Sequence, residues 1–349
     1  MSGAIFLTGA SGFVGRRLVR EAVSGGRSVF ALVRPSSRIP AEVEGEEITV
    51  LRGDVCRPGL GLAAHDLEAL QARVTDVIHA AAVREPRDDS AARSVNVDGT
   101  SHAIDLALRL PRLRRFVHVS SISVAGTYPG RFYEDWLDVG QSFPNAYSKS
   151  KHEAEARVRA AQDLPSVIVR PGSIVGDSTT GESDPSASTF DKLIHAAWRI
   201  RRLPRFVPMP RPFPPKQLFP AVPIDHVARA TLALALAPAP RATTYCLIDP
   251  APPRLEAVMT HLCDRLGAPR FRLSVPLGPA RAIASAPGVA GMLERVRFPV
   301  SSLAYLDCTL DFDDHNARNA LAPADVRCPP FFGYVDALID AFLERAGVA

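Results

Sequence analysis

The chain has 349 residues, of which 22% are charged, and its formal net charge is only +4. This length suits one large α/β domain with an added lobe, or two domains that share an interface. The small positive excess suits an anionic cofactor but excludes a protein that coats a polyanion, so no nucleic-acid partner is expected.

Neither a membrane span nor a disulfide framework is predicted. The longest apolar candidate, from Ala228 to Ala237, is far shorter than the roughly 20 residues of a spanning helix. A core strand begins at Ala4, and nothing before it resembles a signal peptide. The five cysteines lack CxxC spacing, which suits reduced thiols better than disulfides or a zinc site. We therefore expect a cytoplasmic protein without a bound metal.

The first predicted element is a strand from Ala4 to Leu7, which leads into a glycine turn and a helix. The glycines of the turn follow the spacing GxxGxxG. Glycine permits a sharp turn and the close approach of a pyrophosphate, and the N–H groups and dipole of the following helix bind negative charge. A glycine turn that serves packing alone is the alternative. The expected dinucleotide contacts are Thr8, Gly9, Ser11, Gly12, Phe13, Val14 and Gly15.

The second predicted strand, from Ser28 to Val33, ends at a position that discriminates between two dinucleotides. An acid there binds the ribose hydroxyls of NAD, whereas a cation accommodates the 2′-phosphate of NADP. Arg34 occupies this position and predicts NADP, unless it is only a solvated loop charge. After a third strand, Asp54 and Val55 are expected beside the adenine, although an Asp at such a place often only caps a turn.

The fourth predicted strand, from Asp76 to Ala82, ends in small residues that let a cofactor lie close to the backbone, namely Ala80, Ala81 and Ala82. His79 of the same strand is expected in the core. A helix from Arg93 to Leu110 follows, with Asn96 in its first half. Asn is an unfavourable choice inside a helix, which suggests a functional site.

The fifth predicted strand, from Arg115 to Val119, ends in hydroxyl side chains that begin with Ser120 and Ser121. Open α/β sheets bind their ligands at the carboxyl ends of the strands. A helix that begins after residue 145 then carries Tyr147 and Lys151 four positions apart and so on one face. Such a pair is common by chance, but its position after a hydroxyl-tipped strand predicts a catalytic site.

Strands alternate with helices as far as a sixth strand near residue 169, which predicts a doubly wound parallel sheet, or Rossmann-like fold. Residues 1–180 and 222–250 are expected to form the dinucleotide-binding domain. Residues 181–221 and 251–349 are expected to form a smaller, mostly helical substrate lobe.

These motifs together resemble the extended short-chain dehydrogenase/reductases. The matching segments are TGASGFVG, the GDV turn, VIHAAA, NVDGT, the serine-tipped strand, YSKSK and RPGSIVG, in that order. Within this group, residues 53–62 and 174–181 are similar to thioester reductases and fatty acyl reductases, which reduce acyl chains bound to coenzyme A or to a carrier protein. The final third of the chain matches only loosely.

The resemblance implies roles for individual residues. Tyr147 becomes the proton donor, Lys151 its partner and holder of the nicotinamide ribose, and Ser121 the hydroxyl that steadies the substrate oxygen. Asn96 helps to order the Lys151 end of the site. Hydride arriving at a carbonyl leaves an oxyanion that needs such donors, and a tyrosine of pKa about 10 needs a nearby cation to be useful at neutral pH. Further expected cofactor contacts are Ser120, Tyr147, Lys151, Pro171, Gly172, Ser173 and Ile174.

The implied activity is NADPH-dependent reduction of an acyl thioester or the corresponding aldehyde. One alternative is a ketone or alcohol oxidoreductase, or a nucleotide-sugar enzyme, on the same scaffold. Another is a non-catalytic NADP sensor, against which the intact Ser, Tyr and Lys set counts. Fold alone does not decide between substrates.

A basic segment within the expected lobe contains no acidic residue. It includes Lys192, Arg199, Arg201, Arg202, Arg205, Arg211 and Lys216. One hypothesis is a basic rim over the active site that receives the phosphates of coenzyme A or the acidic face of an acyl carrier protein. The alternative is an ordinary solvated helix face and loop.

Overall fold

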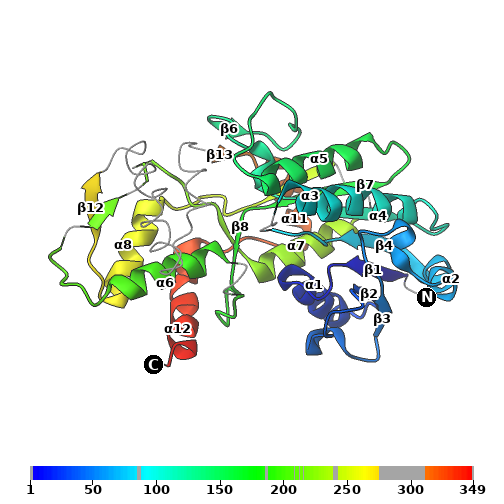
Figure 1. Cartoon of the computed structure of the whole chain (residues 1–349), viewed down its shortest axis with the longest axis horizontal. Coiled ribbons are helices and arrows are strands. Elements are labelled where there is room, and N and C mark those ends of the chain that lie inside the picture. The colour runs from blue at the N-terminus through cyan, green and yellow to red at the C-terminus, as the bar shows by residue number, and fades with distance from the viewer. Residues whose placement is uncertain are drawn as a thin grey trace.

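The structure is a computed structural model. It describes residues 3–84, 88–184, 188–207, 209–211, 213–214, 216–238, 243–274 and 311–347. Figure 1 shows two parts side by side, a sheet flanked by helices and a smaller part made mainly of helices. Among the described residues, no helix combines the length and apolar character needed to cross a bilayer.

Seven parallel strands form the main sheet in the order β11-β7-β5-β4-β1-β2-β3. Their bounds are β1 (Ala4–Thr8), β2 (Val29–Val33), β3 (Ile48–Arg52), β4 (Val74–His79), β5 (Arg115–Val119), β7 (Ser166–Pro171) and β11 (Thr244–Leu247). Every residue of β1, β2 and β5 is buried, as expected for strands covered on both faces. The predicted doubly wound sheet is confirmed. Its strand order reverses between β1 and β4, and a crevice at this switch point is where such sheets bind ligands.

Two hydrophobic clusters cover the two faces of the sheet, because successive side chains of a strand point to opposite sides. Ile5 and Leu7 pack with α1 (Phe13–Ser24) and α7 (Ile224–Leu236). Phe6 packs on the other face with α2 (Ala64–Arg73) and α4 (Gly99–Ala107), beside which lies α5 (Ala146–Ala160).

Some elements differ from the sequence prediction in their bounds. β4 ends at His79, so the three alanines after it lie in a loop at the carboxyl edge of the sheet. The helix expected from residue 93 to 110 is instead α3 (Asp89–Ala92), a π-helical turn η3 (Arg93–Asp98) and α4. The π-helical turn, a rare form that is frequent at functional sites, contains Asn96.

The smaller part is built around an aromatic core. Its elements are α6 (Thr189–Ile200), β9 (Met209–Arg211), α8 (Leu255–Leu266), β12 (Phe271–Ser274) and α12 (Val335–Arg345). Phe190 lies edge-to-face on Phe331, with ring centroids 5.4 Å apart. The paired strands β9 and β12 lie at the end of the molecule away from the main sheet (Figure 1). The short pair β8 (Ser173–Val175) and β10 (Ala221–Pro223) leads back to that sheet.

Near the C-terminus the chain returns to the main sheet. β13 (Asp311–Phe312) pairs with β6 (Arg131–Phe132), and α11 (His315–Leu321) packs against α7 and β11. The predicted division into residues 1–180 with 222–250 and residues 181–221 with 251–349 stays a prediction; α11, which it assigns to the lobe, packs against the main sheet.

The buried carboxylate of Glu134 holds this returning segment in place. It accepts backbone N–H groups of Cys246 at 2.7 Å, Asn316 at 2.5 Å and Ala317 at 3.2 Å. One side chain therefore joins the loop after β6, the strand β11 and the start of α11. Burial raises the pKa of Glu134 to about 7, although the three N–H groups lower it.

Candidate active site

The glycine turn has the tight geometry that its spacing predicts. Gly9 has a φ of 75°, and a Cβ there would lie 2.6 Å from the backbone nitrogen of Ala81. A Cβ on Gly15 would lie 2.0 Å from the carbonyl oxygen of Gly9. The N–H of Gly12 donates to that same carbonyl at 2.9 Å and Gly12 caps α1. Larger residues at Gly9 and Gly15 would push the turn apart, so the first turn of α1 would lose its position at the switch point.

The opposite wall of the switch point is the loop after β4. The N–H of Ala81 donates to Thr8 Oγ1 at 3.3 Å, and Thr8 Oγ1 lies 2.8 Å from His79 Nδ1. The Thr8 hydroxyl is therefore used in hydrogen bonds within the protein. The alanines at positions 80 to 82, by contrast, are partly or fully exposed. Burial, with a smaller contribution from Lys151, lowers the pKa of His79 to about 3. His79 is a neutral core residue, as the sequence predicted.

Asn96 connects this loop with α5. Its side chain accepts the N–H of Val83 at 2.8 Å and donates to the carbonyl of Val83 at 3.0 Å, as a neighbouring strand would. The same amide donates to Ser150 Oγ at 2.8 Å, and Ser150 donates to the carbonyl of Tyr147 at 2.9 Å. Asn96 is buried and lies on the π-helical turn, where the geometry differs from the helix predicted there.

The residues of the predicted catalytic set come from β5 and α5, which meet at the carboxyl edge of the sheet. Lys151 is buried, and its ammonium donates to the carbonyl of Val119 at 2.7 Å. Burial lowers the pKa of Lys151 to about 8, and Glu155 acts in the opposite direction. Tyr147 lies one turn earlier on α5 and is half-buried. Ser121 follows Val119 by two residues, begins η4 (Ile122–Ala125) and accepts the N–H of Ser123 at 3.1 Å, and η4 packs against α5.

A buried ion pair holds together the elements around the β5–α5 corner. Glu155 accepts Arg170 Nη2 at 2.6 Å, and both side chains are fully buried. Ser120 donates to the other oxygen of Glu155 at 2.7 Å. Burial opposes ionisation, but Arg170 holds the pKa of Glu155 below its usual range. The hydroxyl of Ser120 therefore points to this ion pair, and it fixes the end of β5 that presents Val119 and Ser121.

The expected adenosine end of the site lies beyond β2. The Arg34 side chain is exposed, and Arg52 holds its loop by donating to the carbonyls of Arg34 at 3.1 Å and Ser37 at 2.8 Å. The Asp54 carboxylate accepts the N–H of Cys56 at 3.0 Å, so it caps a turn. Val55 is buried, with its side chain against Gly99 of α4.

The loop after β7 closes the third side. A Cβ on Gly172 would lie 2.3 Å from the carbonyl oxygen of Pro220, so this residue must be small. Ser173 and Ile174 are half-buried, whereas Pro171 is buried. The predicted cofactor residues lie along one edge of the sheet, but the side chains of Thr8, Asp54, Val55 and Ser120 are turned to the protein itself.

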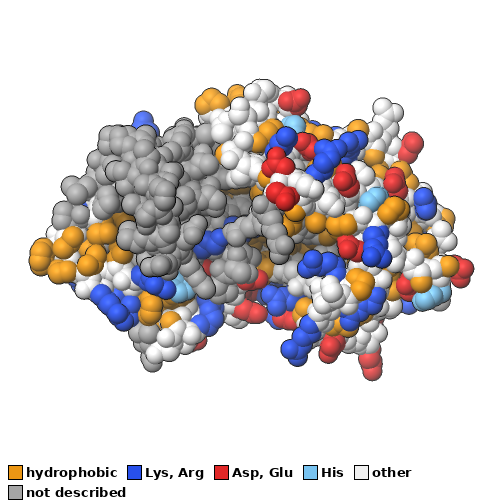
Figure 2. All heavy atoms as spheres, viewed as in Figure 1, with side chains coloured by type: hydrophobic (Ala, Val, Ile, Leu, Met, Phe, Trp, Pro, Cys, Tyr) orange, Lys and Arg blue, Asp and Glu red, His pale blue; other side chains and the backbone are white. Residues whose placement is uncertain are grey.

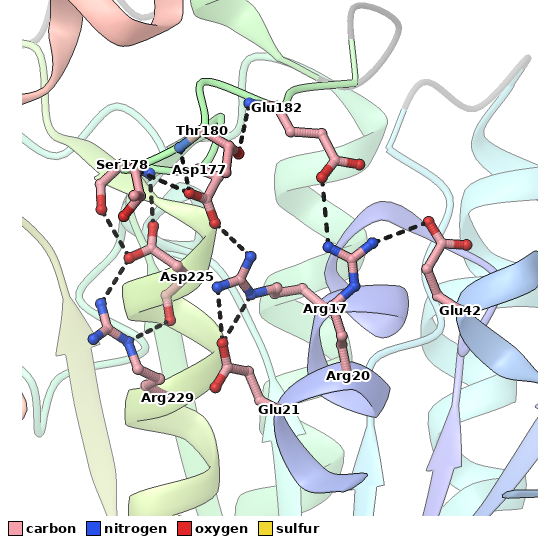
Figure 3. A network of polar contacts seen from close by, with 11 residues as sticks. Arg17, Arg20, Glu21, Glu42, Asp177, Ser178, Thr180, Glu182, Asp225 and Arg229 are labelled. Atoms are coloured by element: carbon pink, nitrogen blue, oxygen red, sulfur yellow. Dashed lines mark hydrogen bonds and ion pairs between the residues drawn. The ribbon is translucent and has the colours of Figure 1, made fainter. Parts of the chain in front are cut away.

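The sequence did not reveal an ionic network that joins α1 to the turn after β8 (Figure 3). Arg17 pairs with Asp177, whose carboxylate also accepts the N–H groups of Thr179 and Thr180. Arg20 lies 3.5 Å from both Glu182 and Glu42. The available signal was Arg17, in the first half of α1, where the helix dipole disfavours cations unless acids lie nearby.

The same turn contacts α7 and α12. Asp225, at the start of α7, accepts the N–H of Ser178 at 2.9 Å and Arg229 Nη2 at 2.7 Å. A Cβ on Gly181 would lie 2.1 Å from the carbonyl oxygen of Ala337 in α12. The turn therefore connects the helix of the glycine motif with the smaller part of the molecule.

The predicted basic rim does not form a single surface over the site. Arg201 stacks on Trp198 at 3.8 Å from the ring centroid, and Arg211 pairs with Glu256 at 2.5 Å. The loop from residue 201 to 207 joins α6 to β9, which lies away from the main sheet (Figure 1). The segment extends outward because α6 packs its apolar face on α8 and leads away from the sheet edge.

Within the described part of the chain, no cluster of side chains could hold a metal ion.

Comparisons with known proteins agree with this architecture. The family described as male sterility protein matches residues 7–231. The Drosophila melanogaster fatty acyl-CoA reductase wat is 29% identical over a region that covers 49% of this chain and 43% of that protein. The curated relatives are longer: the chain spans 6%, 19%, 7% and 43% of the length of four of them.

Two solved structures are similar over nearly the whole chain. The terminal R domain of the myxalamid PKS-NRPS biosynthetic pathway has a TM-score of 0.80 and 25% identity, covering 100% of this chain and 93% of that domain. A thiolation-reductase di-domain from an archaeal non-ribosomal peptide synthetase has a TM-score of 0.71 and 18% identity, covering 99% and 76%. The second likeness shows the fold alone.

Proposed function

We propose that this chain, which belongs to the male sterility protein family of extended short-chain dehydrogenase/reductases, is an NADPH-dependent reductase of carrier-linked or coenzyme A-linked acyl thioesters. The observation that carries the proposal is the corner between β5 and α5. There the buried ammonium of Lys151 bonds to the carbonyl of Val119, with Tyr147 one helical turn away and Ser121 two residues along. The similarity to acyl-CoA reductases and to a terminal R domain supports an acyl substrate.

The residues present fit a dinucleotide. Gly9 and Gly15 leave no room for side chains, so the backbone of the turn is free to approach a pyrophosphate at the start of α1. Arg34 supplies an exposed cation at the end of β2, where a 2′-phosphate would be held. When bound, the cofactor supplies a hydride. Lys151 would hold the nicotinamide ribose.

The protein residues would handle the proton and the developing charge. As hydride reaches the thioester carbonyl carbon, Ser121 donates a hydrogen bond to the oxygen and Tyr147 gives it a proton, so a hemithioacetal forms. The positive charge of Lys151 stabilises the tyrosinate left behind. As the C–S bond of the hemithioacetal breaks, its hydroxyl proton passes to the departing sulfur, so an aldehyde and a free thiol leave, and the tyrosinate regains a proton from solvent. A second hydride and proton would convert the aldehyde to an alcohol at the same residues.

The test is a substrate panel with product identification. Purified protein is incubated with NADPH and matched acyl-coenzyme A, acyl-carrier, aldehyde, ketone and nucleotide-sugar substrates. The proposal expects NADPH oxidation with thioesters, together with stoichiometric free thiol and an aldehyde or alcohol. Turnover of ketones or nucleotide sugars without any turnover of thioesters would instead support the alternative.

A further inference from the structure

The end of the molecule remote from the main sheet carries a surface that the reaction chemistry does not use. We define the distal patch as Arg199, Arg202, Leu203, Arg205 and Phe206, all of which are exposed. Phe206 is 85% exposed and Leu203 is 43% exposed, in a segment without an acidic residue. Figure 2 shows apolar and basic side chains gathered at this end of the molecule.

Among the residues that the structure describes, no acidic side chain forms an ion pair with the three arginines of the distal patch. Arg205 Nε donates to the carbonyl of Gly267 at 3.3 Å, which orders the arginine without neutralising it. Asp264 is the described acid whose charge interacts with that of Arg205. Its carboxylate forms a bidentate ion pair with Arg270, with N–O distances of 2.7 and 2.8 Å. Arg199 lies in the last turn of α6, where the helix dipole favours a cation in any case. The charges that helix formation does not explain are therefore those of Arg202 and Arg205.

This combination of side chains is that of a protein interface. Arginine and aromatic residues are enriched at interface centres, whereas Lys, Glu and Asp are depleted. A single exposed apolar residue needs no explanation, but Phe206 and Leu203 lie three positions apart among arginines. Phosphates of a small ligand would engage the arginines and leave the two apolar side chains in water. An acidic protein with an apolar patch on its surface would pair with the arginines and also cover the two apolar side chains.

The position of α6 connects the distal patch with the candidate active site. Thr189, the first residue of α6, accepts a bond from Arg84 Nη2 at 2.8 Å in the loop after β4, at the sheet edge. The helix has 12 residues and so is about 18 Å long. A partner on the distal patch would therefore lie about one helix length from the sheet edge. It would need to present its acyl group on an extended arm.

We propose that the distal patch is the docking site of an acidic acyl carrier protein, with Phe206 as the apolar anchor and Arg202 and Arg205 as the charge partners. This inference rests on the proposed function for the identity of the cargo. Such a surface would act on the encounter and retention of the carrier, because complementary charges accelerate association and buried aromatic anchors slow dissociation. The distal patch would not change the turnover of an acyl thioester that is not attached to a carrier protein.

The experiment compares two probes. One is an acidic acyl carrier protein that bears an octanoyl thioester on its pantetheine arm and a fluorescent label. The other is octanoyl-N-acetylcysteamine, the same thioester without the protein. The variants are Arg202→Ser with Arg205→Ser, Phe206→Ser, and the control Arg109→Ser, an exposed arginine at the opposite end of α4 from the site. Carrier affinity is measured by anisotropy at low and high salt, and NADPH oxidation is followed with both thioesters.

We expect each patch variant to weaken carrier binding about tenfold or more, and the arginine variant to flatten its salt dependence. Arg109→Ser should bind normally, and N-acetylcysteamine turnover should be unchanged in all variants. No carrier binding by the unmodified protein, or equal binding by all variants, would overturn the docking site. Binding that the variants lose, without any thioester reduction, would uphold the docking site and refute the proposed function. Thermal unfolding midpoints then show that the variants are folded.

Discussion

Three ionisable side chains define what the candidate active site can do. Lys151 is buried, its ammonium bonds to a neutral carbonyl, and no carboxylate of the described residues forms an ion pair with it. Tyr147 is half-buried on the same helix, and Arg34 is exposed at the other end of the expected cofactor site. Each makes a different prediction about turnover, pH dependence or cofactor choice.

Tyr147→Phe removes one hydroxyl that acts mainly as charge develops on the substrate oxygen. We expect turnover to fall about 10²-fold or more, while the dissociation constant of NADPH changes little. Stopped-flow or steady-state NADPH oxidation measures the first quantity, and fluorescence titration measures the second. A folded variant with near-normal turnover would remove Tyr147 from the mechanism.

The pKa of Lys151 near 8 predicts how activity depends on pH. As pH rises through about 8, the ammonium loses its charge and kcat/KM for an aldehyde should fall. The titration of Lys151 itself would not unfold the protein, because between pH 8 and 10.5 the lysine holds a proton in the unfolded chain that it has lost in the folded one, so the cost of burying its charge is relieved as pH rises. An activity that stays level to pH 10 would contradict the assigned role.

Arg34 predicts a preference for NADPH over NADH. A charge-assisted contact to phosphate contributes roughly 1.5 to 3 kcal/mol, so Arg34→Ala should narrow the difference between the two dissociation constants about tenfold or more. Arg109→Ala, another exposed arginine, should leave both constants unchanged. Equal affinities for the two cofactors in the unmodified protein would refute the prediction.

At the scale of elements, the parts that carry local signals could be predicted from the sequence. The buried strands, the glycine turn and the helix with Tyr147 and Lys151 follow from apolar runs, glycine spacing and helical period. The π-helical turn could not be predicted, because Asn96 takes that conformation to bond Val83 and Ser150, which are distant in the chain. The short pairs β6 with β13 and β9 with β12 also join segments far apart, and two to four residues carry no periodicity.

Glu134 is the clearest case of an element held by a single distant side chain. Glu134→Ala would leave two buried backbone N–H groups and the half-buried N–H of Asn316 without their acceptor, and each donor left without a partner costs about 1 to 3 kcal/mol in general. We expect the free energy of unfolding in urea to fall by about 3 kcal/mol or more. Asp135→Ala is the matched control, because that neighbour is exposed. Equal stabilities of the two variants would show that α11 is held by its apolar contacts alone.

For the whole molecule, the sequence predicted two parts but not how they are joined. The connection is the turn from Asp177 to Gly181, which pairs with Arg17 of α1 and packs closely on α12. Ion pairs between segments 160 residues apart leave no local pattern in a sequence. The direction of α6 also depends on packing between distant segments, so the basic segment was expected over the site, whereas Arg199, Arg202 and Arg205 lie at the far end of α6.

Reduction of an acyl thioester at the β5–α5 corner can be followed in a single-turnover experiment. The unmodified protein, in excess over octanoyl-coenzyme A, is mixed with NADPH, and NADPH loss, free thiol and octanal are quantified from the same samples. Thiol should appear in step with NADPH oxidation, and octanal, or octanol after a second equivalent, should account for the acyl group. Release of thiol without NADPH oxidation, or no NADPH oxidation with octanoyl-coenzyme A, would contradict the proposed activity.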